Sequence, residues 1–185
     1  MKNWMLVCLG LIFSVNVMAI EEPKYTVLHE FENDIEIRAY EPHLVAVTKM
    51  DGSQNSGFRV LAGYIFGGND KEQEIAMTAP VSTTMMADSP EMTFMIPSEY
   101  DLAELPKPND VRVNFREVPA YTAAAIRFSG RANSDIVEAH WQKLRAFLAN
   151  SEWKGLGEPT LNQYNPPWTL GFWRRNEIII PVIKK

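Results

Sequence analysis

The sequence predicts an α+β domain whose strands curl into a barrel-like core, with one helix from each half of the chain packed against it. Short runs of alternating apolar residues indicate strands in both halves. Two longer segments carry apolar residues at helical spacing, one near residues 58–65 and the other near 134–148. The order of elements in the first half recurs in the second, which favours a pseudo-twofold internal repeat.

The first half of the chain predicts three strands, a helix and two further strands. Alternating or β-branched runs mark the first three strands, at about residues 25–31, 35–39 and 44–47. A helix is expected next, because Phe58, Leu61 and Ile65 recur at helical spacing. Gly67-Gly68-Asn69 is expected to end it, since these residues tolerate the positive φ of helix C-termini. The further strands fall around residues 75–85 and 92–96.

The second half follows a proline-rich link at residues 105–110 and predicts a similar series. Alternation and apolar runs mark strands at about residues 111–115, 121–128 and 178–183. Pro181 cannot donate a ladder hydrogen bond, so the end of the last strand is expected to lie at an edge or a bulge of the sheet. A helix is expected to begin at Ser134, with an apolar face formed by Val137, Trp141, Leu144 and Leu148.

The two halves also match residue by residue at a constant offset. The matching pairs are Arg38 with Arg116, Ala46 with Ala124, Gly52 with Gly130, and Asn55-Ser56 with Asn133-Ser134. Each pair falls at the same point in the predicted order of elements. A duplication is therefore favoured over the alternative, a chance similarity. We predict one domain over residues 20–185, with pseudo-repeats at about residues 25–104 and 110–185.

Residues 1–19 are predicted to form a secretory signal peptide. Lys2 precedes an apolar run at residues 4–13, and small side chains follow in Val17-Met18-Ala19. The run is too short to cross a bilayer easily, because a spanning helix takes about 20 apolar residues. An uncleaved anchor is the alternative. We therefore expect a periplasmic or secreted protein that does not insert into the membrane after signal cleavage.

Charge and cysteine content restrict the partners and the chemistry. The chain has 18 Lys and Arg against 23 Asp and Glu, a formal net charge of −5, which argues against nucleic acid as a partner. Cys8 is the only cysteine and lies in the predicted signal peptide, so the mature chain has no thiol chemistry. No motif for a nucleophile, a phosphate or a zinc ion is present. These observations favour a non-catalytic protein.

Histidine and methionine are the remaining candidates for contact with a metal or a ligand. His29, His43 and Met77 are weak candidates for a metal ligand, because no two histidines are spaced as partners on one element. We interpret His29 as partly buried with a hydrogen-bond partner, and the alternative is that it faces a pocket. Five methionines fall between residues 77 and 95. They suit an irregular apolar cavity, or ordinary core filling.

Several segments resemble the SOUL heme-binding protein family. They are Ile35-Glu36-Ile37-Arg38-Ala39-Tyr40, Tyr64-Ile65-Phe66-Gly67-Gly68-Asn69, Ile75-Ala76-Met77-Thr78-Ala79-Pro80-Val81, Tyr164-Asn165-Pro166-Pro167 and Arg174-Arg175-Asn176-Glu177. The resemblance runs in the expected order from about Tyr25 to Ile183. It implies a distorted antiparallel β-barrel of about eight strands with two flanking helices, in agreement with the duplicated elements.

The resemblance also implies reversible, non-catalytic binding of heme or another tetrapyrrole at an apolar surface beside the first helix. Such a protein would be a carrier, a buffer or a scavenger. The matching positions are Asn55, Phe58, Ala62, Gly63, Phe66, Gly171 and Phe172. Phe58, Ala62 and Phe66 recur at four-residue steps, so they can form one stripe for a flat macrocycle. The alternative is that this stripe packs on the sheet.

The sequence departs from the family at positions that matter for heme. Asn55, Gly63 and Gly171 stand where some members carry basic residues suited to propionates, and Ala39 stands where some carry a histidine. Three alternatives follow: the ligand is held mainly by apolar contact, the ligand differs from heme, or the binding site lies elsewhere than in those family members.

Glu177 leaves a second function open. It is either a paired strand-end residue or a residue of the concave face, where the similar bacterial effector-binding domains use a pocket glutamate for cationic ligands. The second reading predicts a binding module for another hydrophobic or cationic small molecule. A tetrapyrrole-modifying enzyme is the third hypothesis.

Overall fold

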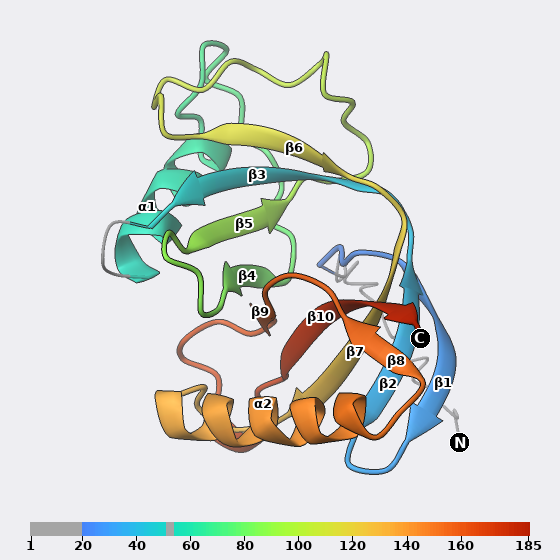
Figure 1. Ribbon diagram of the computed structural model, residues 1–185. Coiled ribbons are helices and arrows are strands. Elements are labelled where there is room, and N and C mark those ends of the chain that lie inside the picture. The colour runs from blue at the N-terminus through green and yellow to red at the C-terminus, as the bar shows by residue number, and fades with distance from the viewer. Residues whose placement is uncertain (1–19, 51–53) are drawn as a thin grey trace, which may run out of the picture.

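A strongly curled antiparallel sheet forms the body of the protein, and two helices pack against it (Figure 1). The structure is a computed structural model and describes residues 20–50 and 54–185. The predicted signal peptide at residues 1–19 and the expected turn at Gly52 lie outside the described residues. The sheet has 10 strands, in the order β1-β2-β7-β10-β9-β4-β5-β3-β6 with β8 paired to β10. Because β1 and β6 remain edges, the predicted barrel is open.

The elements follow each other in nearly the predicted order. The strands are β1 (Tyr25–Phe31), β2 (Ile35–Tyr40), β3 (His43–Lys49), β4 (Val81–Thr84), β5 (Glu91–Met95), β6 (Asn114–Val118), β7 (Tyr121–Phe128), β8 (Trp153–Gly155), β9 (Thr160–Gln163) and β10 (Asn176–Lys184). The helices are α1 (Gln54–Ile65), α2 (Ser134–Ala149) and a 3-10 turn, η1 (Gly171–Trp173). The α+β class, the N-terminal hairpin and the two helices are thereby confirmed.

Two predicted strands are shorter or later than expected. Only β4 forms within residues 75–85, because this segment bonds elsewhere: the Thr78 hydroxyl donates to the Met95 carbonyl, and the Ala79 amide donates to the Glu21 carbonyl. The strand expected at residues 111–115 begins at β6 instead. Asp110 accepts hydrogen bonds from the backbone and side chain of Arg112, and the resulting turn delays the strand.

The predicted C-terminal strand is β10, which runs through Pro181 to Lys184, and Pro181 lies where the strand changes neighbours. Pairing with β9 stops at Ile179, and pairing with β8 begins at Val182. The Pro181 carbonyl accepts a hydrogen bond from Leu156 at 2.8 Å, so its nitrogen faces this gap between neighbours. A proline is tolerated inside the strand because no partner needs its missing N–H.

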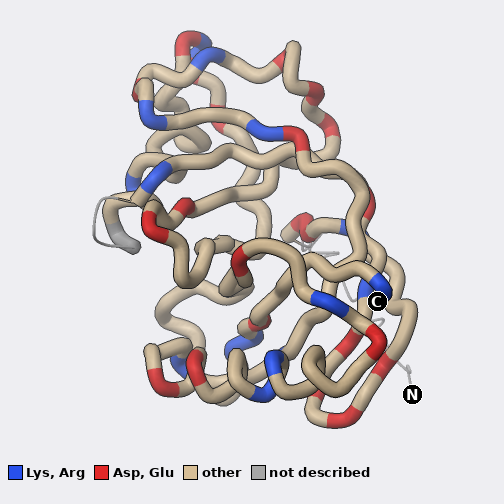
Figure 2. The backbone as a smooth tube through the Cα atoms, viewed as in Figure 1, with Lys and Arg blue, Asp and Glu red and all other residues tan. Residues whose placement is uncertain are grey.

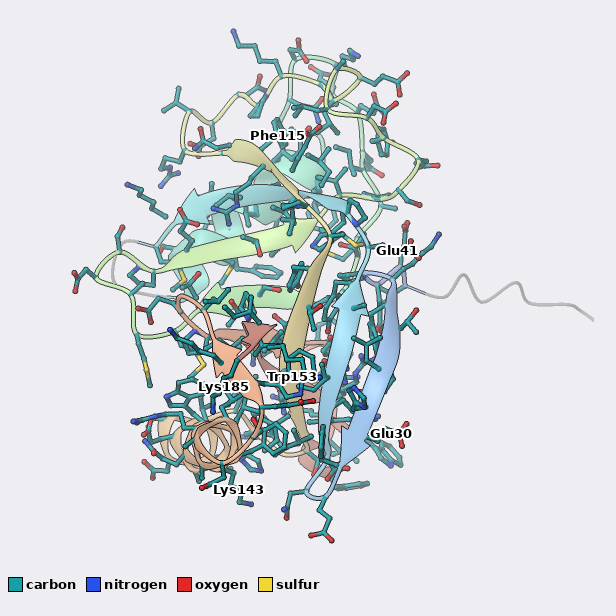
Figure 3. The ribbon with its side chains drawn as sticks, turned by 45° about the vertical axis from the view of Figure 1, so that its right-hand side comes forward. Glu30, Glu41, Phe115, Lys143, Trp153 and Lys185 are labelled. Atoms are coloured by element: carbon teal, nitrogen blue, oxygen red, sulfur yellow. The ribbon has the colours of Figure 1, made fainter. Side chains whose placement is uncertain are left out.

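Two hydrophobic cores lie between the sheet and the helices. α1 packs on β3 and β5, and α2 packs on β7, β8 and β10. The buried face of α2 is Val137, Trp141, Leu144 and Leu148, as predicted. Trp153 of β8, labelled in Figure 3, belongs to the core under α2. Neither described helix combines the length and the hydropathy that a membrane span requires.

Apart from β1 and β8, the strands are arranged symmetrically about the centre of the sheet, each with a counterpart from the other repeat. One half runs β2-β7-β10-β9 and the other β6-β3-β5-β4, with β9 and β4 paired at the centre. β2 corresponds to β6 and β3 to β7, as the repeat predicts from Arg38 with Arg116 and Ala46 with Ala124. The outer pairings, β2 with β7 and β3 with β6, join strands from different repeats. The two repeats therefore interlock.

Gly68 and Gly63 lie close together but differ in the room around them. A Cβ atom on Gly68 would meet the Gly63 carbonyl oxygen at 2.5 Å, whereas one on Gly63 meets no atom within 4 Å. We expect Gly68→Ala to lower the free energy of unfolding by about 1–3 kcal/mol through overpacking. Gly63→Ala should raise it by up to about 1 kcal/mol, because Gly63 lies in a helix. Urea unfolding compares the two, and equal stability of both variants would contradict this.

Candidate functional site

The outer face of α1 carries the residues predicted to contact a ligand. Phe58 is 43% exposed and packs edge-on against Phe94, with ring centroids 5.4 Å apart. Phe66, just beyond the end of α1, is 65% exposed. Ala62 is buried against the sheet, so it separates the two rings rather than completing an exposed stripe. Asn55 lies in α1, and its side chain is outside the described part of the chain.

A groove of about 340 Å³ runs along α1, between the helix and residues 109–112. Gly63 lines this groove, and its missing side chain leaves the wall open. On the opposite side Arg112 pairs with Asp110 at 2.6 Å, and this pairing lowers the pKa of Asp110 to about 2. The helical wall of the groove is therefore mixed, with Val60 and Tyr64 beside Arg59, and the opposite rim is ion-paired.

Arg59 is the cation of α1 that faces solvent beside this groove. Its guanidinium makes no ion pair with any side chain in residues 20–50 or 56–185. Phe66 and Arg59 each lie three or four positions from Gly63, so all three occupy neighbouring places on the surface of α1. The surface thus combines two exposed aromatic rings, an open groove and a positive charge.

Gly171 and Phe172, the other predicted contacts, belong to η1. The Gly130 amide donates to the Gly171 carbonyl at 2.8 Å, which fastens η1 to the connection between β7 and α2. Phe172 is 68% exposed and packs on Trp173, with ring centroids 4.9 Å apart. α1 and α2 occupy opposite ends of the molecule (Figure 1). The described contacts therefore join η1 to the half that carries α2.

The three candidate metal ligands lie on different elements. Met77 is partly buried against the core under α1, and His43 begins β3, with Nδ1 3.0 Å from the Glu41 carbonyl. His29 is exposed, which corrects the expectation that it is partly buried. A β-bulge after Val27 shifts the register, so His29 no longer shares a face with Val27. Within the described residues, no three His, Cys, Asp or Glu side chains converge on a possible metal site.

Glu177 of β10 is 0% exposed, and its carboxylate accepts four hydrogen bonds. Arg38 of β2 donates two of them, from Nη1 to Oε2 at 2.7 Å and from Nη2 to Oε1 at 3.3 Å. The Tyr164 hydroxyl donates to Oε2 at 2.8 Å, and Arg175 Nε donates to Oε1 at 3.0 Å. An ionised carboxylate has about four acceptor sites. The protein itself therefore occupies the acceptors that a cationic ligand would use.

For Glu177 and Arg38, burial shifts the pKa in one direction, and the ion pairs and hydrogen bonds between these side chains shift it in the other. Burial alone would raise the pKa of Glu177, but hydrogen bonds and charges from Arg38, Arg175 and Tyr164 hold it below its usual value. Burial alone would lower the pKa of Arg38, whereas Glu177 and Tyr40 raise it above its usual range. Burial and the nearby Glu177 charge raise the pKa of Tyr164. At neutral pH the cluster is an ionised carboxylate held by charged guanidinium groups and a neutral phenol.

Small residues of β7 allow this contact between strands that are not neighbours. β7 separates β2 from β10, and Ala123 pairs with Arg38 on one side and with Pro181 on the other. Ala123 and Ala125 are both buried on this face of the sheet. Their methyl groups leave room for the Arg38 side chain to cross β7. The sequence reasoning missed this function of Arg38, although the alanine run at residues 123–125 is visible in the sequence.

The other half of the sheet carries an equivalent pair that is exposed to solvent. Glu91 pairs with Lys49 between β5 and β3, just as Glu177 pairs with Arg127 between β10 and β7. Arg116, the repeat counterpart of Arg38, bonds Glu91 from Nη1 to Oε2 at 2.9 Å. The same two residue types are thus buried in one half and exposed in the other.

The sequence of the chain matches a known protein family. A sequence model of the family described as SOUL heme-binding protein matches residues 20–181. No protein of curated function matches the sequence.

Solved structures of similar fold have little sequence identity to the chain. The EcmrR C-terminal domain has a TM-score of 0.66 and 14% identity, and the match covers 84% of this chain and 100% of that one. A hydrolase from Listeria innocua has a TM-score of 0.58 and 7% identity, with 82% and 93% covered. An uncharacterized conserved protein from Listeria innocua has a TM-score of 0.60 and 8% identity over the same shares. At these identities the similarity shows the fold alone.

The buried pair and its exposed counterpart make a matched test of stability. We expect Glu177→Gln to lower the free energy of unfolding by about 3 kcal/mol, because the buried Arg38 guanidinium loses its buried carboxylate partner and keeps only the partly exposed Glu36. Glu91→Gln breaks the equivalent exposed pair and should cost at most about 1 kcal/mol. Urea unfolding at pH 7 measures both variants. Similar losses would show that burial of the Glu177 pair is not what makes it important.

The lowered pKa of Glu177 adds a pH dependence to the same experiment. A carboxyl whose pKa is lower in the folded than in the unfolded state stabilises the fold above the unfolded value, which is about 4.3 for glutamate. That stabilisation is lost as the pH falls through this value toward the folded pKa. We therefore expect the difference between wild type and Glu177→Gln to be largest near neutral pH and to shrink below about pH 4. A difference independent of pH would exclude ionisation of Glu177 as its source.

Proposed function

The chain belongs to the SOUL heme-binding protein family, and we propose that it binds heme or a related tetrapyrrole reversibly and without catalysis. We place the ligand on the outer face of α1. The observation that carries this proposal is the exposure of Phe58 on α1 and of Phe66 just beyond its end, on a helix that also borders a groove left open by Gly63. Contiguous exposed apolar patches that are rimmed by polar residues commonly mark a binding surface.

The dimensions of the α1 groove suit one edge of a macrocycle. Its volume of about 340 Å³ lies within the range of about 300–1,000 Å³ that is usual for ligand pockets. The exposed ring of Phe66 extends the apolar surface beyond the groove. A flat, mostly apolar ligand would therefore bury aromatic surface that the protein leaves in contact with water.

Arg59 fits the acidic part of such a ligand. Tetrapyrroles of the heme type carry carboxylates, and a guanidinium pairs with a carboxylate in a bidentate geometry. The basic residues that some family members carry are replaced here by Asn55, Gly63 and Gly171, and Arg59 is a cation on the same helix. We propose that Arg59 compensates for those replacements.

The alternative function, a module that binds a cationic molecule through Glu177, is less well supported. Arg38, Arg175 and Tyr164 already occupy the Glu177 carboxylate.

Figure 2 shows acidic and basic positions interspersed along the backbone, without a broad basic face in this view. We propose from this distribution, and from the net negative charge, that nucleic acid is not a partner.

We also propose that the protein works outside the cytoplasm. Residues 1–19 have the pattern of a secretory signal peptide, and cleavage after Ala19 would leave the domain that the family match covers from residue 20. A periplasmic or secreted tetrapyrrole-binding protein would act as a carrier, a buffer or a scavenger.

Hemin titration of residues 20–185 tests the proposed surface. We expect a saturable Soret change at about one equivalent, and Phe66→Ser should weaken binding about ten-fold or more, which corresponds to about 1.4 kcal/mol. Arg59→Gln should also weaken hemin binding, with a smaller effect at high salt. Phe31→Ser removes an exposed ring on β1 and serves as the control, with unchanged affinity. Loss of affinity in Phe31→Ser but not in Phe66→Ser would contradict the placement.

The same titration distinguishes η1 and the candidate iron ligands. His29 and His43 lie on β1 and β3, and Met77 is partly buried beneath α1. We therefore expect His29→Ala, His43→Ala and Met77→Leu to leave the position of the Soret band unchanged. A shifted band in one variant would identify that residue as an iron ligand. Weakened binding in Phe172→Ser would show that η1 contributes to the same site.

A further inference from the structure

We propose that the concave face of the sheet holds a second binding site, for a small uncharged molecule with an aromatic body and an amide or hydroxyl end. A cavity of about 280 Å³ lies on this face. Its walls come from both halves of the molecule, with Val45 and Met95 on one side and Ile179 on the other. This site is separate from the α1 surface and does not depend on the function proposed for it.

A row of polar side chains crosses the floor of this cavity. Ser82 of β4 pairs with Thr93 of β5 on one side and with Asn162 of β9 on the other. Directly paired residues project from the same face of a sheet. All three residues line the cavity, so two hydroxyls and an amide lie side by side at its wall. Such a row can exchange hydrogen bonds with one polar end of a ligand.

Asn162 is the buried member of this row, and one of its side-chain atoms has no internal partner. It is only 7% exposed, and its Oδ1 atom accepts no hydrogen bond from the described residues. Buried polar groups are nearly always paired, so an unpaired amide at a cavity wall requires an explanation. If the Asn162 side chain turned toward the cavity, a ligand that carries a hydrogen-bond donor would give Oδ1 its missing partner.

The charged groups around the cavity are already paired, which favours an uncharged ligand. Arg38 and Arg175 saturate Glu177, and Arg116 pairs with Glu91. His43, also in the lining, has Nδ1 3.0 Å from the Glu41 carbonyl. A charged ligand would lose its hydration without gaining a counter-charge.

The size and walls of the cavity favour a single ring. A volume of about 280 Å³ corresponds to roughly nine water molecules, which is too small to enclose a macrocycle. The rings of Tyr40 and Tyr121 stack at 5.0 Å with an interplanar angle of 10°, and both line the cavity. These aromatic rings provide apolar surface for the body of the ligand. The polar row would then meet its hydrogen-bonding end.

Three isosteric probes test the proposal: benzamide, which is neutral, benzamidine, a cation, and benzoate, an anion. Each is titrated into ¹⁵N-labelled residues 20–185, and the NMR signals of the Asn162 side chain and of residues 82 and 93 are followed. We expect saturable shifts with benzamide, and at least ten-fold weaker binding of the two charged probes. Phe66→Ser, which alters the α1 surface, should bind benzamide as wild type does.

Asn162→Leu is the diagnostic variant. It should bind benzamide at least ten-fold more weakly, and without ligand it should melt at a higher temperature, because an unpaired buried amide is replaced by an apolar side chain. Asn114→Leu, an exposed asparagine of β6, is the matched control and should leave binding unchanged. Ser82→Ala provides a second test of the polar row if Asn162→Leu does not fold, and should also weaken binding.

Three results would overturn the proposal. Benzamidine or benzoate binding as tightly as benzamide would show that the cavity does not favour an uncharged ligand. If benzamide produced no saturable shifts, the cavity would not take this class of ligand. Unchanged benzamide affinity in both Asn162→Leu and Ser82→Ala would show that the polar row is not the recognition element.

Discussion

The ionised carboxylate of Glu177, buried with four hydrogen bonds, is the constraint on which the rest of this structure depends. Removing a carboxylate from water is costly unless its partners are held in place. The partners come from β2, from the residue after β9 and from the segment before β10, so their positions fix three parts of the curled sheet relative to one another. The same arrangement explains why β7 must be lined with alanine at the crossing point. The charges of Glu177, Arg38 and Arg175 on the concave face are paired with one another. This face therefore offers a ligand polar and apolar contacts rather than an unpaired charge at Glu177.

The exposed counterpart of this pair shows how a duplicated fold can use one interaction for two purposes. Arg116 and Glu91 keep the residue types and the register of Arg38 and Glu177, but water competes for them. The half with the buried pair is fastened at its concave surface, while the other half carries the open groove beside α1. The buried pair therefore lies in one half of the sheet and the proposed tetrapyrrole surface in the other.

The sequence predicted most of the elements in their observed order, but it did not predict the contacts between elements far apart in the chain. Alternation located the N-terminal hairpin, and helical spacing gave the buried face of α2 correctly. β8 and β9 have only 3 and 4 residues, too few to show a period, and were missed. Arg38 and Glu177 are 139 positions apart, so no local pattern could pair them. The exposure of His29 depends on a bulge, and one extra residue in a strand leaves little trace in composition.

The interlocked strand order also bears on the history of the chain. The pairings of β2 with β7 and of β3 with β6 are equivalent under the pseudo-twofold relation, and both join different repeats. If a half-length ancestor had the same strands, both pairings would have formed between two separate copies, as exchanged strands do in a symmetric dimer. Fusion of two such genes would have converted a subunit interface into the interior of one chain. Neither half would then have inherited the ability to exist alone.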